Sequence, residues 1–150
     1  MKIGDQCPGF SAFNQFGERV NSNDYIGKKH VVVFFYPKDF TPGCTKEVCE
    51  FRDDYDEFVQ LNCEIIGISS DSQKSHLAFS NRYKLKYHLL SDSQNQIRKM
   101  FKVPKNLYGL IPGRVTFVIN KNGKITGMYN SLSNATSHIN FALECLQSNS

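Results

Sequence analysis

The sequence has no tryptophan and no hydrophobic run long enough to cross a bilayer. A membrane-spanning helix needs roughly 20 apolar residues, whereas the longest apolar run, Val31 to Tyr36, has the length of a strand. Internal repeats and low-complexity segments are also missing, and 40% hydrophobic with 21% charged residues is an ordinary globular composition. We therefore expect a soluble single domain over residues 1–150, with no membrane association.

Long runs of one charge are missing as well. The 18 Lys and Arg residues exceed the 14 Asp and Glu residues by a net charge of +4, and they are dispersed along the chain. A nucleic-acid-binding arm would need these charges gathered in one basic segment. The sequence therefore predicts no nucleic-acid partner.

The amino terminus lacks the signals that direct a protein out of its compartment of synthesis. Met1 to Gln6 contains neither the apolar core of a secretory signal nor the Arg-rich amphipathic pattern of a transit peptide. The five cysteines are an odd number and are scattered except for Cys44 and Cys49, which suits a reducing compartment. We predict a cytoplasmic protein in which any disulfide is transient and catalytic.

The patterns along the chain alternate between strands and helices. Val31 to Tyr36 is typical of a strand buried on both faces, and Pro37 ends it. After a turn, apolar residues recur at the three- and four-residue steps of one amphipathic helix that has Cys44 in its first turn. These apolar residues are Val48, Phe51, Tyr55, Phe58 and Val59.

The other expected elements are a hairpin over Phe10–Val20, strands over Glu64–Ser69, Tyr87–Leu90 and Val115–Ile119, helices over Ser72–Tyr83 and Asn95–Phe101, a hairpin turn at Asn122-Gly123 leading into Lys124–Met128, and a final helix capped by Asn134. This order predicts an α/β sandwich with a mixed central sheet and helices on both faces. The segment Lys105 to Pro112 matches no pattern that we can assign.

Cys44 has the local surroundings of a reactive thiol. It follows a buried strand and a turn and begins a predicted helix, where free backbone N–H groups and the helix dipole favour the thiolate. The structural alternative is a buried cysteine that only packs, because free cysteines are often buried. Thr41, three residues earlier, can either cap the helix or hold an oxygen substrate near the sulfur.

The run Pro37-Lys38-Asp39-Phe40-Thr41-Pro42-Gly43-Cys44 resembles the active-site pattern of the peroxiredoxins. Its continuation through Cys49 to Asp53 is similar to the peroxiredoxin Q, or bacterioferritin comigratory protein, subgroup. Further similar segments are Gly4-Asp5, Pro8 with Phe10, Gly67-Ile68-Ser69 with Asp71, Leu90-Ser91-Asp92 and Arg114 to Ile119. The resemblance implies a thioredoxin-like fold, which the Phe10–Val20 hairpin extends at the amino terminus.

The resemblance also implies roles for individual residues. Cys44 is the peroxidatic nucleophile and Cys49 is the resolving cysteine. Arg114 and the backbone N–H groups near Gly43 and Cys44 stabilise the thiolate and the developing alkoxide. Thr41 orients the peroxide, Pro37 shields the sulfur, and Glu47 orients an arginine. This set would hold the substrate through Thr41, Gly43, Cys44 and Arg114. Arg52 is interpreted as a solvated helix residue without a catalytic role.

The implied activity is that of an atypical 2-Cys peroxidase for hydrogen peroxide and organic hydroperoxides, with a role in antioxidant defence. Peroxide converts Cys44 to a sulfenic acid, and Cys49 condenses with it to a disulfide before further oxidation. Thioredoxin or a similar dithiol protein would reduce this disulfide. The resemblance favours a monomer, and the chemistry calls for no cofactor and no metal.

Three other interpretations stay open. A thiol-disulfide oxidoreductase usually has two residues between its cysteines, whereas four separate Cys44 from Cys49. A zinc module needs about four closely spaced Cys or His ligands, and Cys44 with Cys49 is the one close pair. A holdase or redox-signalling partner would use the fold only for binding. Cys7, Cys63 and Cys145 are assigned to packing or surface, and His30, His76, His88 and His138 are not assigned to catalysis.

Overall fold

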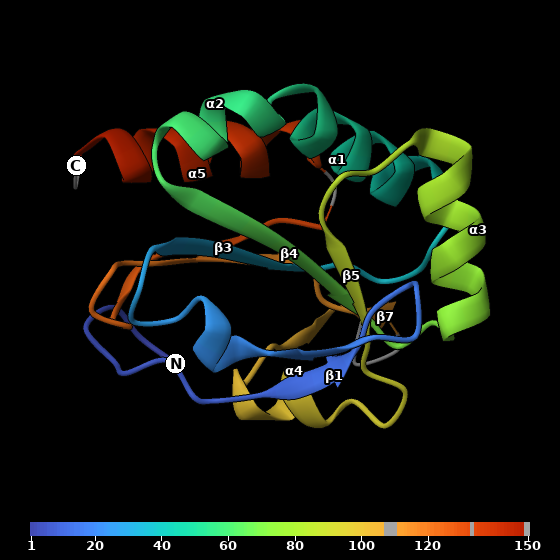
Figure 1. Ribbon diagram of the computed structural model, residues 1–150, viewed down its shortest axis with the longest axis horizontal. Helices are drawn as coiled ribbons and strands as arrows, with labels where there is room; N and C mark the ends of the chain where they lie inside the picture. Colours follow the sequence, from blue (N-terminus) through green and yellow to red (C-terminus); the bar gives the residue numbers. More distant parts are fainter. Residues whose placement is uncertain (107–110, 133, 149–150) are drawn as a thin grey trace.

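The computed structural model describes residues 1–106, 111–132 and 134–148. Its centre is a five-stranded sheet in the order β5-β4-β3-β8-β9 (Figure 1). The central strand β3 (His30–Phe35) pairs in parallel with β4 (Cys63–Ser69) and antiparallel with β8 (Val115–Ile119). The outer strands are β5 (His88–Ser91) and β9 (Ile125–Asn130). The sheet is mixed, which confirms the predicted fold class.

Helices cover both faces of this sheet. On one face lie α1 (Pro42–Asp53), α2 (Tyr55–Gln60) and α5 (Thr136–Ser148), while α3 (Gln73–Tyr83) packs beside β5 (Figure 1). On the other face lie α4 (Gln96–Met100) and the hairpin of β1 (Ser11–Phe13) and β2 (Arg19–Asn21). None of the described helices has both the length and the apolarity to cross a membrane.

The sequence of β3 explains why the sheet is buried on both sides. Val32 and Phe34 point into the core under α1 and α5, whereas Val31, Val33 and Phe35 point into the second core under α4 and the hairpin. All six residues of β3 are buried, because successive side chains of a strand alternate between the faces. The β-branched and aromatic run therefore has a partner layer on each face.

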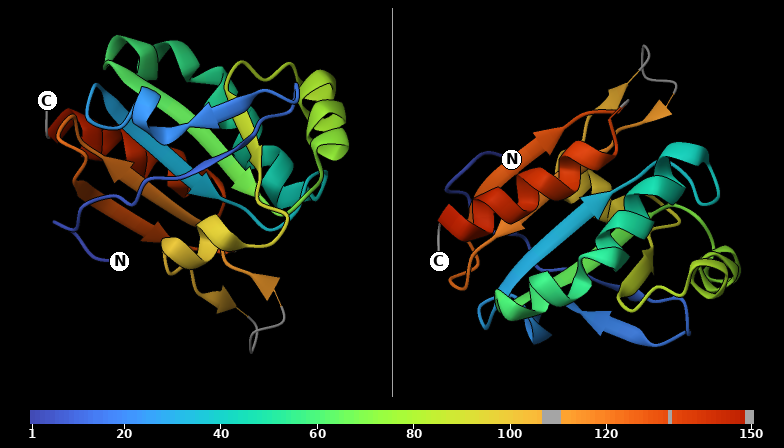
Figure 2. Two further views of the ribbon diagram at one scale, coloured as in Figure 1. Left: turned by 60° about the horizontal axis from the view of Figure 1, so that its bottom comes forward. Right: turned by 90° about the horizontal axis from the view of Figure 1, so that it is seen from above.

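Three short elements were not predicted. A 3₁₀ turn, η1 (Ser22–Asp24), follows the hairpin, and the strands β6 (Lys105–Asn106) and β7 (Ile111–Pro112) form a separate antiparallel pair. This pair projects from the body of the molecule in both views of Figure 2. It falls in the segment that matched no pattern, of which residues 107–110 lie outside the described residues.

The prediction of one continuous helix after Cys44 is wrong. The helix ends at Asp53, and Asp54, with φ −95° and ψ 8°, separates it from α2. Phe51 and Phe58 remain buried, but Val59 is 51% exposed instead of lying on the apolar face. The periodic apolar pattern runs through the break, because both helices pack against the same core.

Candidate active site

Cys44 lies in the first turn of α1, directly beyond the carboxyl end of β3. Thr41 is the residue before the helix, Pro42 is its first residue, and the Thr45 N–H donates to the Thr41 carbonyl at 2.8 Å. Proline suits this position, because its missing N–H would have no partner in the helix anyway. The Cys44 side chain is buried, with 1% exposed, at the positive end of the helix dipole.

Arg114 immediately precedes β8, the strand beside β3, and its side chain reaches the sulfur. Its Nη2 donates to Cys44 Sγ at 3.3 Å, its Nη1 to Glu47 Oε1 at 2.6 Å, and its Nε to the Leu132 carbonyl at 3.1 Å. Three hydrogen bonds in three directions fix the guanidinium plane. Burial alone would lower the pKa of Arg114, but Glu47 and Cys44 outweigh that effect and raise it.

Glu47 lies one turn after Cys44 and is completely buried. Burial raises the pKa of Glu47, and the charge and hydrogen bond of Arg114 oppose the rise. Its second oxygen, Oε2, has no hydrogen-bond partner among the described residues and lies 3.8 Å from His138 Nδ1. His138 is held by the Thr116 hydroxyl at 2.8 Å and by the Ser131 carbonyl at 2.7 Å.

Gly43 allows the arginine to approach the helix start. A Cβ atom on Gly43 would stand 3.0 Å from Arg114 Nη2, closer than such atoms normally pack. Thr41 does not cap the helix with its side chain, because its hydroxyl donates to the Lys38 carbonyl at 2.8 Å. Its oxygen lone pairs can therefore accept a hydrogen bond. Pro37 lies two residues after the end of β3 and is half-buried.

Cys49 is in the same helix as Cys44 and is half-buried against the core. Both side chains are thiols in this structure. Burial raises the pKa of Cys49, and Arg52 opposes the rise. Arg52 itself is more than a solvated residue, because it donates to the Tyr83 carbonyl at 2.7 Å. The two thiols thus lie on one helix without a bond between them.

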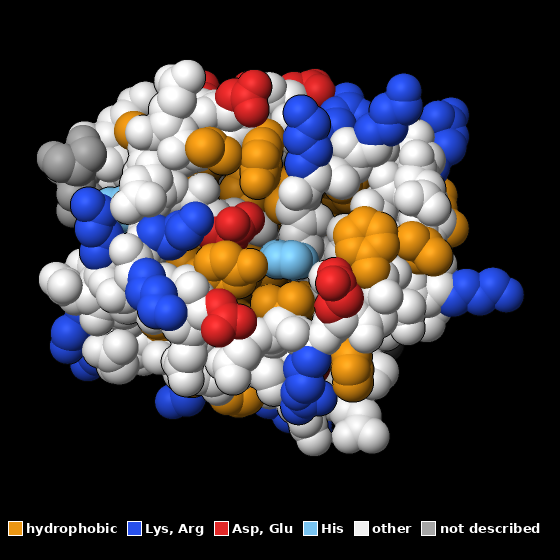
Figure 3. All heavy atoms as spheres, in the orientation of Figure 1, with side chains coloured by type: hydrophobic (Ala, Val, Ile, Leu, Met, Phe, Trp, Pro, Cys, Tyr) orange, Lys and Arg blue, Asp and Glu red, His pale blue; other side chains and the backbone are white. Residues whose placement is uncertain are grey.

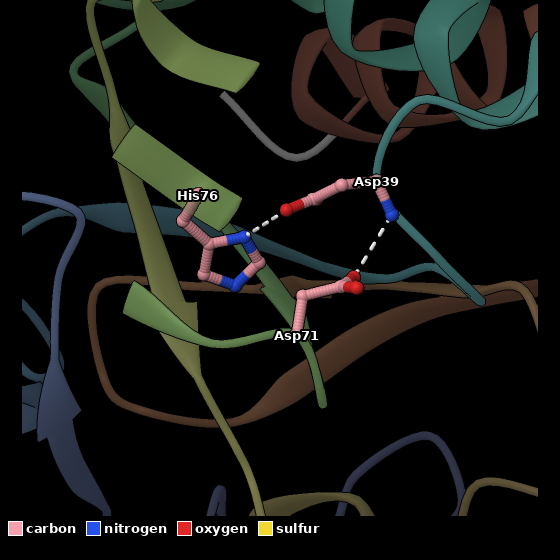
Figure 4. A group of neighbouring side chains, drawn as sticks. All are labelled: Asp39, Asp71 and His76. Carbon is pink, nitrogen blue, oxygen red and sulfur yellow. Dashed lines mark hydrogen bonds and ion pairs between the residues drawn. The ribbon is translucent and has the colours of Figure 1, made fainter. Parts of the chain in front are cut away.

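The turn before Thr41 is held by a buried cluster that sequence reasoning missed. His76 Nδ1 lies 2.7 Å from Asp39 Oδ2, and the Asp39 N–H donates to Asp71 Oδ2 at 2.8 Å (Figure 4). The Tyr36 hydroxyl donates to the other Asp39 oxygen at 2.6 Å. Phe40 follows with φ +66°, an unusual backbone conformation for a bulky residue. The cluster therefore holds a strained turn in place.

The hydrogen bonds of His76 use both of its ring nitrogens. Nδ1 faces the Asp39 carboxyl group at 2.7 Å, and Nε2 faces the Leu90 carbonyl at 3.1 Å. Asp39, Asp71 and His76 have the residue types of a metal site, but both ring nitrogens of His76 already contact other groups of the protein.

Arg98 is a second buried arginine near the site that the sequence did not single out. Its guanidinium donates to the carbonyls of Tyr36 and Gly113. No spacing rule connects Arg98 or His76 with Cys44, because packing between separate elements brings them together. The sequence signal was limited to Asp92 at the start of the α4 segment, which accepts the N–H groups of Ile97 and Arg98.

Cys7 and Cys63 have the surroundings of packing residues. Both are buried, and burial raises the pKa of each thiol to about 12, which keeps it protonated and unreactive. Cys145 lies in α5 with its sulfur 3.8 Å from the Thr126 hydroxyl. Cys7 and Cys63 therefore differ from Cys44, whose sulfur accepts a hydrogen bond from Arg114.

The chain matches the family model AhpC/TSA over residues 3–128. Curated relatives include chloroplastic peroxiredoxin Q from Sedum lineare, 46% identical over 145 residues, which cover 97% of this chain and 77% of that protein. Chloroplastic peroxiredoxin Q from Arabidopsis thaliana is 46% identical over 144 residues, which cover 96% of this chain and 66% of the relative. The chain thus spans roughly two thirds to three quarters of these relatives.

Solved structures of similar fold carry related names. Peroxidoxin BcpB from Mycobacterium tuberculosis has a TM-score of 0.90 and 35% identity, with 99% of this chain and 97% of that chain covered. The bacterioferritin comigratory protein of Xanthomonas campestris, described for its alkyl peroxide reduction activity, has a TM-score of 0.84 and 28% identity, with coverage of 93% and 91%.

The comparisons correct one prediction and confirm two others. The predicted cytoplasmic location is contradicted, because the curated relatives are named as chloroplastic and point to a chloroplast instead. An amino terminus without a recognisable signal was therefore a poor guide to compartment. The predicted thioredoxin-like fold and thiol-dependent peroxidase chemistry are both supported. The chain belongs to the AhpC/TSA family and is a thiol-dependent peroxidase of the peroxiredoxin Q type.

Proposed function

We propose that Cys44 is the nucleophile of this peroxidase and that Cys49 resolves the oxidised sulfur. The observation that carries this proposal is the hydrogen bond of 3.3 Å from Arg114 to Cys44 Sγ at a helix amino terminus. A guanidinium and the helix dipole both favour the thiolate over the thiol. Burial raises the pKa of Cys7 and of Cys63 to about 12, which disfavours the thiolate at those two positions.

The first half-reaction joins sulfur to one peroxide oxygen. The Cys44 thiolate attacks, the S–O bond forms as the O–O bond breaks, and the hydroperoxide proton moves to the leaving oxygen. The products are an alcohol or water and an oxidised Cys44, which takes up a proton to become a sulfenic acid. Arg114 stabilises the charge that develops on the oxygens, and Thr41, whose own proton is donated to Lys38, accepts the hydroperoxide O–H. Pro37 shields the sulfur.

The second half-reaction forms a disulfide. The Cys49 thiol attacks the sulfenic acid sulfur, an S–S bond forms, and water leaves. A dithiol reductant, such as thioredoxin, then reduces the disulfide to two thiols and becomes oxidised itself.

A hollow of about 410 Å³ lies beside the carboxyl end of α1. It is lined by Arg52, Lys84 and Lys86, with Asp53 and Asp56. Lys and Arg side chains gather at the upper right of the face in Figure 3, over the α1 and α3 end.

We further propose that residues 1–150 act as one domain and as a monomer in antioxidant defence. All four catalytic positions, Thr41, Cys44, Cys49 and Arg114, come from a single copy of the chain. A second copy is therefore unnecessary for either half-reaction. Sedimentation of the reduced and oxidised protein tests this: one species near 17.1 kDa is expected, and a stable dimer in both states would contradict it.

The peroxidase cycle is tested with the unmodified chain. Reduced protein receives one equivalent of hydrogen peroxide or an organic hydroperoxide, and the disulfide is mapped by mass spectrometry before thioredoxin with its reductase is added. We expect a Cys44–Cys49 disulfide and continued peroxide consumption with thioredoxin. A disulfide that joins other cysteines would contradict the site. Turnover with glutathione and glutaredoxin but not with thioredoxin would contradict the proposed reductant.

A further inference from the structure

Arg98 is buried beneath the active site and is bound in an unusual way. Only 5% of it is exposed, yet within the described residues both hydrogen bonds of its guanidinium go to backbone carbonyls. Nη1 donates to the Gly113 carbonyl at 2.8 Å and Nη2 to the Tyr36 carbonyl at 3.1 Å. A carbonyl accepts a hydrogen bond without cancelling the positive charge, so the charge of Arg98 is not neutralised where it binds.

The two carbonyls stand at the point where β3 and β8 separate. The last residue pair of this antiparallel ladder is Phe35 with Val115, so Tyr36 and Gly113 lie just beyond it. Arg98 supplies donors to carbonyls that the ladder no longer reaches, and its guanidinium lies 5.5 Å from the centre of the Phe35 ring. The guanidinium of Arg98 therefore links the end of β3 to the segment before β8, which would otherwise diverge.

The residues that follow these carbonyls belong to the active site. Pro37, which comes directly after Tyr36, begins the segment leading to Cys44, and Arg114 comes directly after Gly113. The position of Gly113 is tightly restrained, because a Cβ atom there would collide with the Pro104 carbonyl oxygen. Any shift of Arg98 would therefore move the nucleophile segment relative to the arginine that binds the sulfur.

The charge of Arg98 acts on the same site. Burial lowers the pKa of Arg98, and the negative charges of Asp92 and Cys44 oppose the decrease. Cys44 is thus within electrostatic reach of Arg98. Arg114, which immediately precedes β8, and Glu47 of α1 are also buried at this site, and they are paired with each other at 2.6 Å. Because Glu47 shares the Arg114 guanidinium with the sulfur, a further cation nearby adds to the stabilisation of the thiolate.

We propose that Arg98 is a positioning residue for peroxide reduction, one that joins the backbone ahead of Pro37 and Arg114 and supplies a second positive charge to the Cys44 thiolate. A purely structural arginine would hold the strand ends and leave the thiol unchanged. The two roles can be separated, because lysine keeps the positive charge but lacks the planar guanidinium group whose two nitrogens bind two carbonyls. The inference rests on the proposed role of Cys44 as nucleophile.

The test compares Arg98→Met, Arg98→Lys and Arg19→Met with the parent chain. Arg19 is a matched control, since it also donates a hydrogen bond, to Ser11 at 3.0 Å, and lies over a phenyl ring, but it is on the exposed hairpin. For each protein we would measure the thermal unfolding midpoint, the alkylation of Cys44 by iodoacetamide against pH, and the single-turnover rate of Cys44 with hydrogen peroxide.

In Arg98→Met the midpoint of alkylation should move about one pH unit higher. The peroxide rate should fall at least about tenfold, because the nucleophile segment and Arg114 also lose their relative positions. Arg98→Lys should keep the alkylation midpoint near that of the parent and still lose peroxide rate, because the strand ends are no longer joined. Arg19→Met should match the parent in both. If Arg98→Met does not fold, the lysine variant alone decides: a parental peroxide rate would overturn the proposal.

A folded Arg98→Met variant with the alkylation midpoint and peroxide rate of the parent would likewise overturn it. Failure of the proposed function has a different signature. In that case, the parent itself would take up no oxygen at Cys44 on treatment with peroxide, whatever residue stands at position 98.

Discussion

Arg114 Nη2 lies 3.3 Å from Cys44 Sγ, although 69 residues separate the two positions in the sequence. The contact exists because β8 runs antiparallel to β3, which brings the start of β8 to the end of β3 where α1 begins. The same guanidinium is fixed by Glu47 and the Leu132 carbonyl. Positive charge is therefore held at the sulfur before any substrate arrives, which is the arrangement that lowers a transition state without reorganisation.

Replacing Arg114 should weaken this arrangement in two measurable ways. In Arg114→Met the midpoint pH for alkylation of Cys44 should rise, and the second-order rate with peroxide should fall by roughly a hundredfold or more, as when a donor to a developing oxyanion is removed. Arg114→Lys keeps the positive charge but lacks the planar guanidinium group, so its alkylation midpoint and its rate with peroxide should lie between those of the parent and of Arg114→Met. Alkylation and peroxide reaction at parental rates in the methionine variant would show that the contact has no role.

His138 should make the stability of the protein depend on pH. Burial lowers the pKa of His138 from 6.5 to about 4. Between these values the unfolded chain binds more protons than the folded one, so stability is full above about pH 6.5 and falls as the pH decreases toward 4. The expected loss from pH 7 to pH 5 is roughly 2 kcal/mol.

Urea unfolding of the parent and of His138→Gln at both pH values isolates this effect from the titration of the carboxylates. Glutamine can still accept from Thr116 and donate to the Ser131 carbonyl. The variant should therefore lose less stability on acidification than the parent. Equal losses in the two proteins would show that His138 titrates normally in the folded state.

Asp39 should be important for stability as well as for the turn before Thr41. Asp39→Asn removes the buried carboxyl group that accepts from the Tyr36 and Ser75 hydroxyls and contacts His76 Nδ1 at 2.7 Å. Leaving buried polar groups without their partners in this way should cost about 1–3 kcal/mol. The exposed Asp24→Asn is the control and should change the free energy of unfolding by less than about 0.5 kcal/mol. A similarly small effect for Asp39→Asn would contradict a stabilising role for these contacts.

Oxidation should open the first turns of α1. Five residues along a helix separate Cα atoms by about 8–9 Å, whereas a disulfide needs about 4.4–6.8 Å. Because Cys44 and Cys49 both lie within α1, the bridge cannot form while the helix is intact. Amide hydrogen exchange over Gly43 to Arg52 should be faster in the oxidised protein, a local order to disorder change.

The Asp39 N–H should remain protected in both states, because its acceptor is the Asp71 carboxylate outside the helix. The opening would then stop at the strained Phe40 turn. Equal protection of α1 in the reduced and oxidised proteins, with the Cys44–Cys49 bond confirmed by mass, would contradict this part of the account.

The parts of the fold that the sequence predicted are those with a local pattern. The apolar run of β3 and the Asn122-Gly123 turn each act within a few residues, and both occur where expected. The break at Asp54 was missed because apolar spacing continues across it. Val59 was assigned to the core for the same reason.

The site residues that the sequence predicted are likewise those that lie close together along the chain. Thr41, Cys44 and Cys49 lie in one short segment, so their proximity follows from the sequence alone. Arg114 was placed only through a family resemblance, and no rule of spacing could have brought it to the sulfur. The contact of His76 with Asp39 and the role of Arg98 were not predicted, because buried pairs and strand-end contacts depend on how distant elements pack, which composition and periodicity do not record.

The central claim is that Cys44 performs the attack and Cys49 the resolution, and intact mass measured after one equivalent of peroxide tests it most directly. Cys49→Ser should gain one oxygen and then stop, because the sulfenic acid at Cys44 has no thiol to condense with. Cys44→Ser should gain no oxygen and show no turnover with reductant. Undiminished peroxidase turnover by Cys44→Ser, or an unoxidised Cys49→Ser protein, would contradict the account.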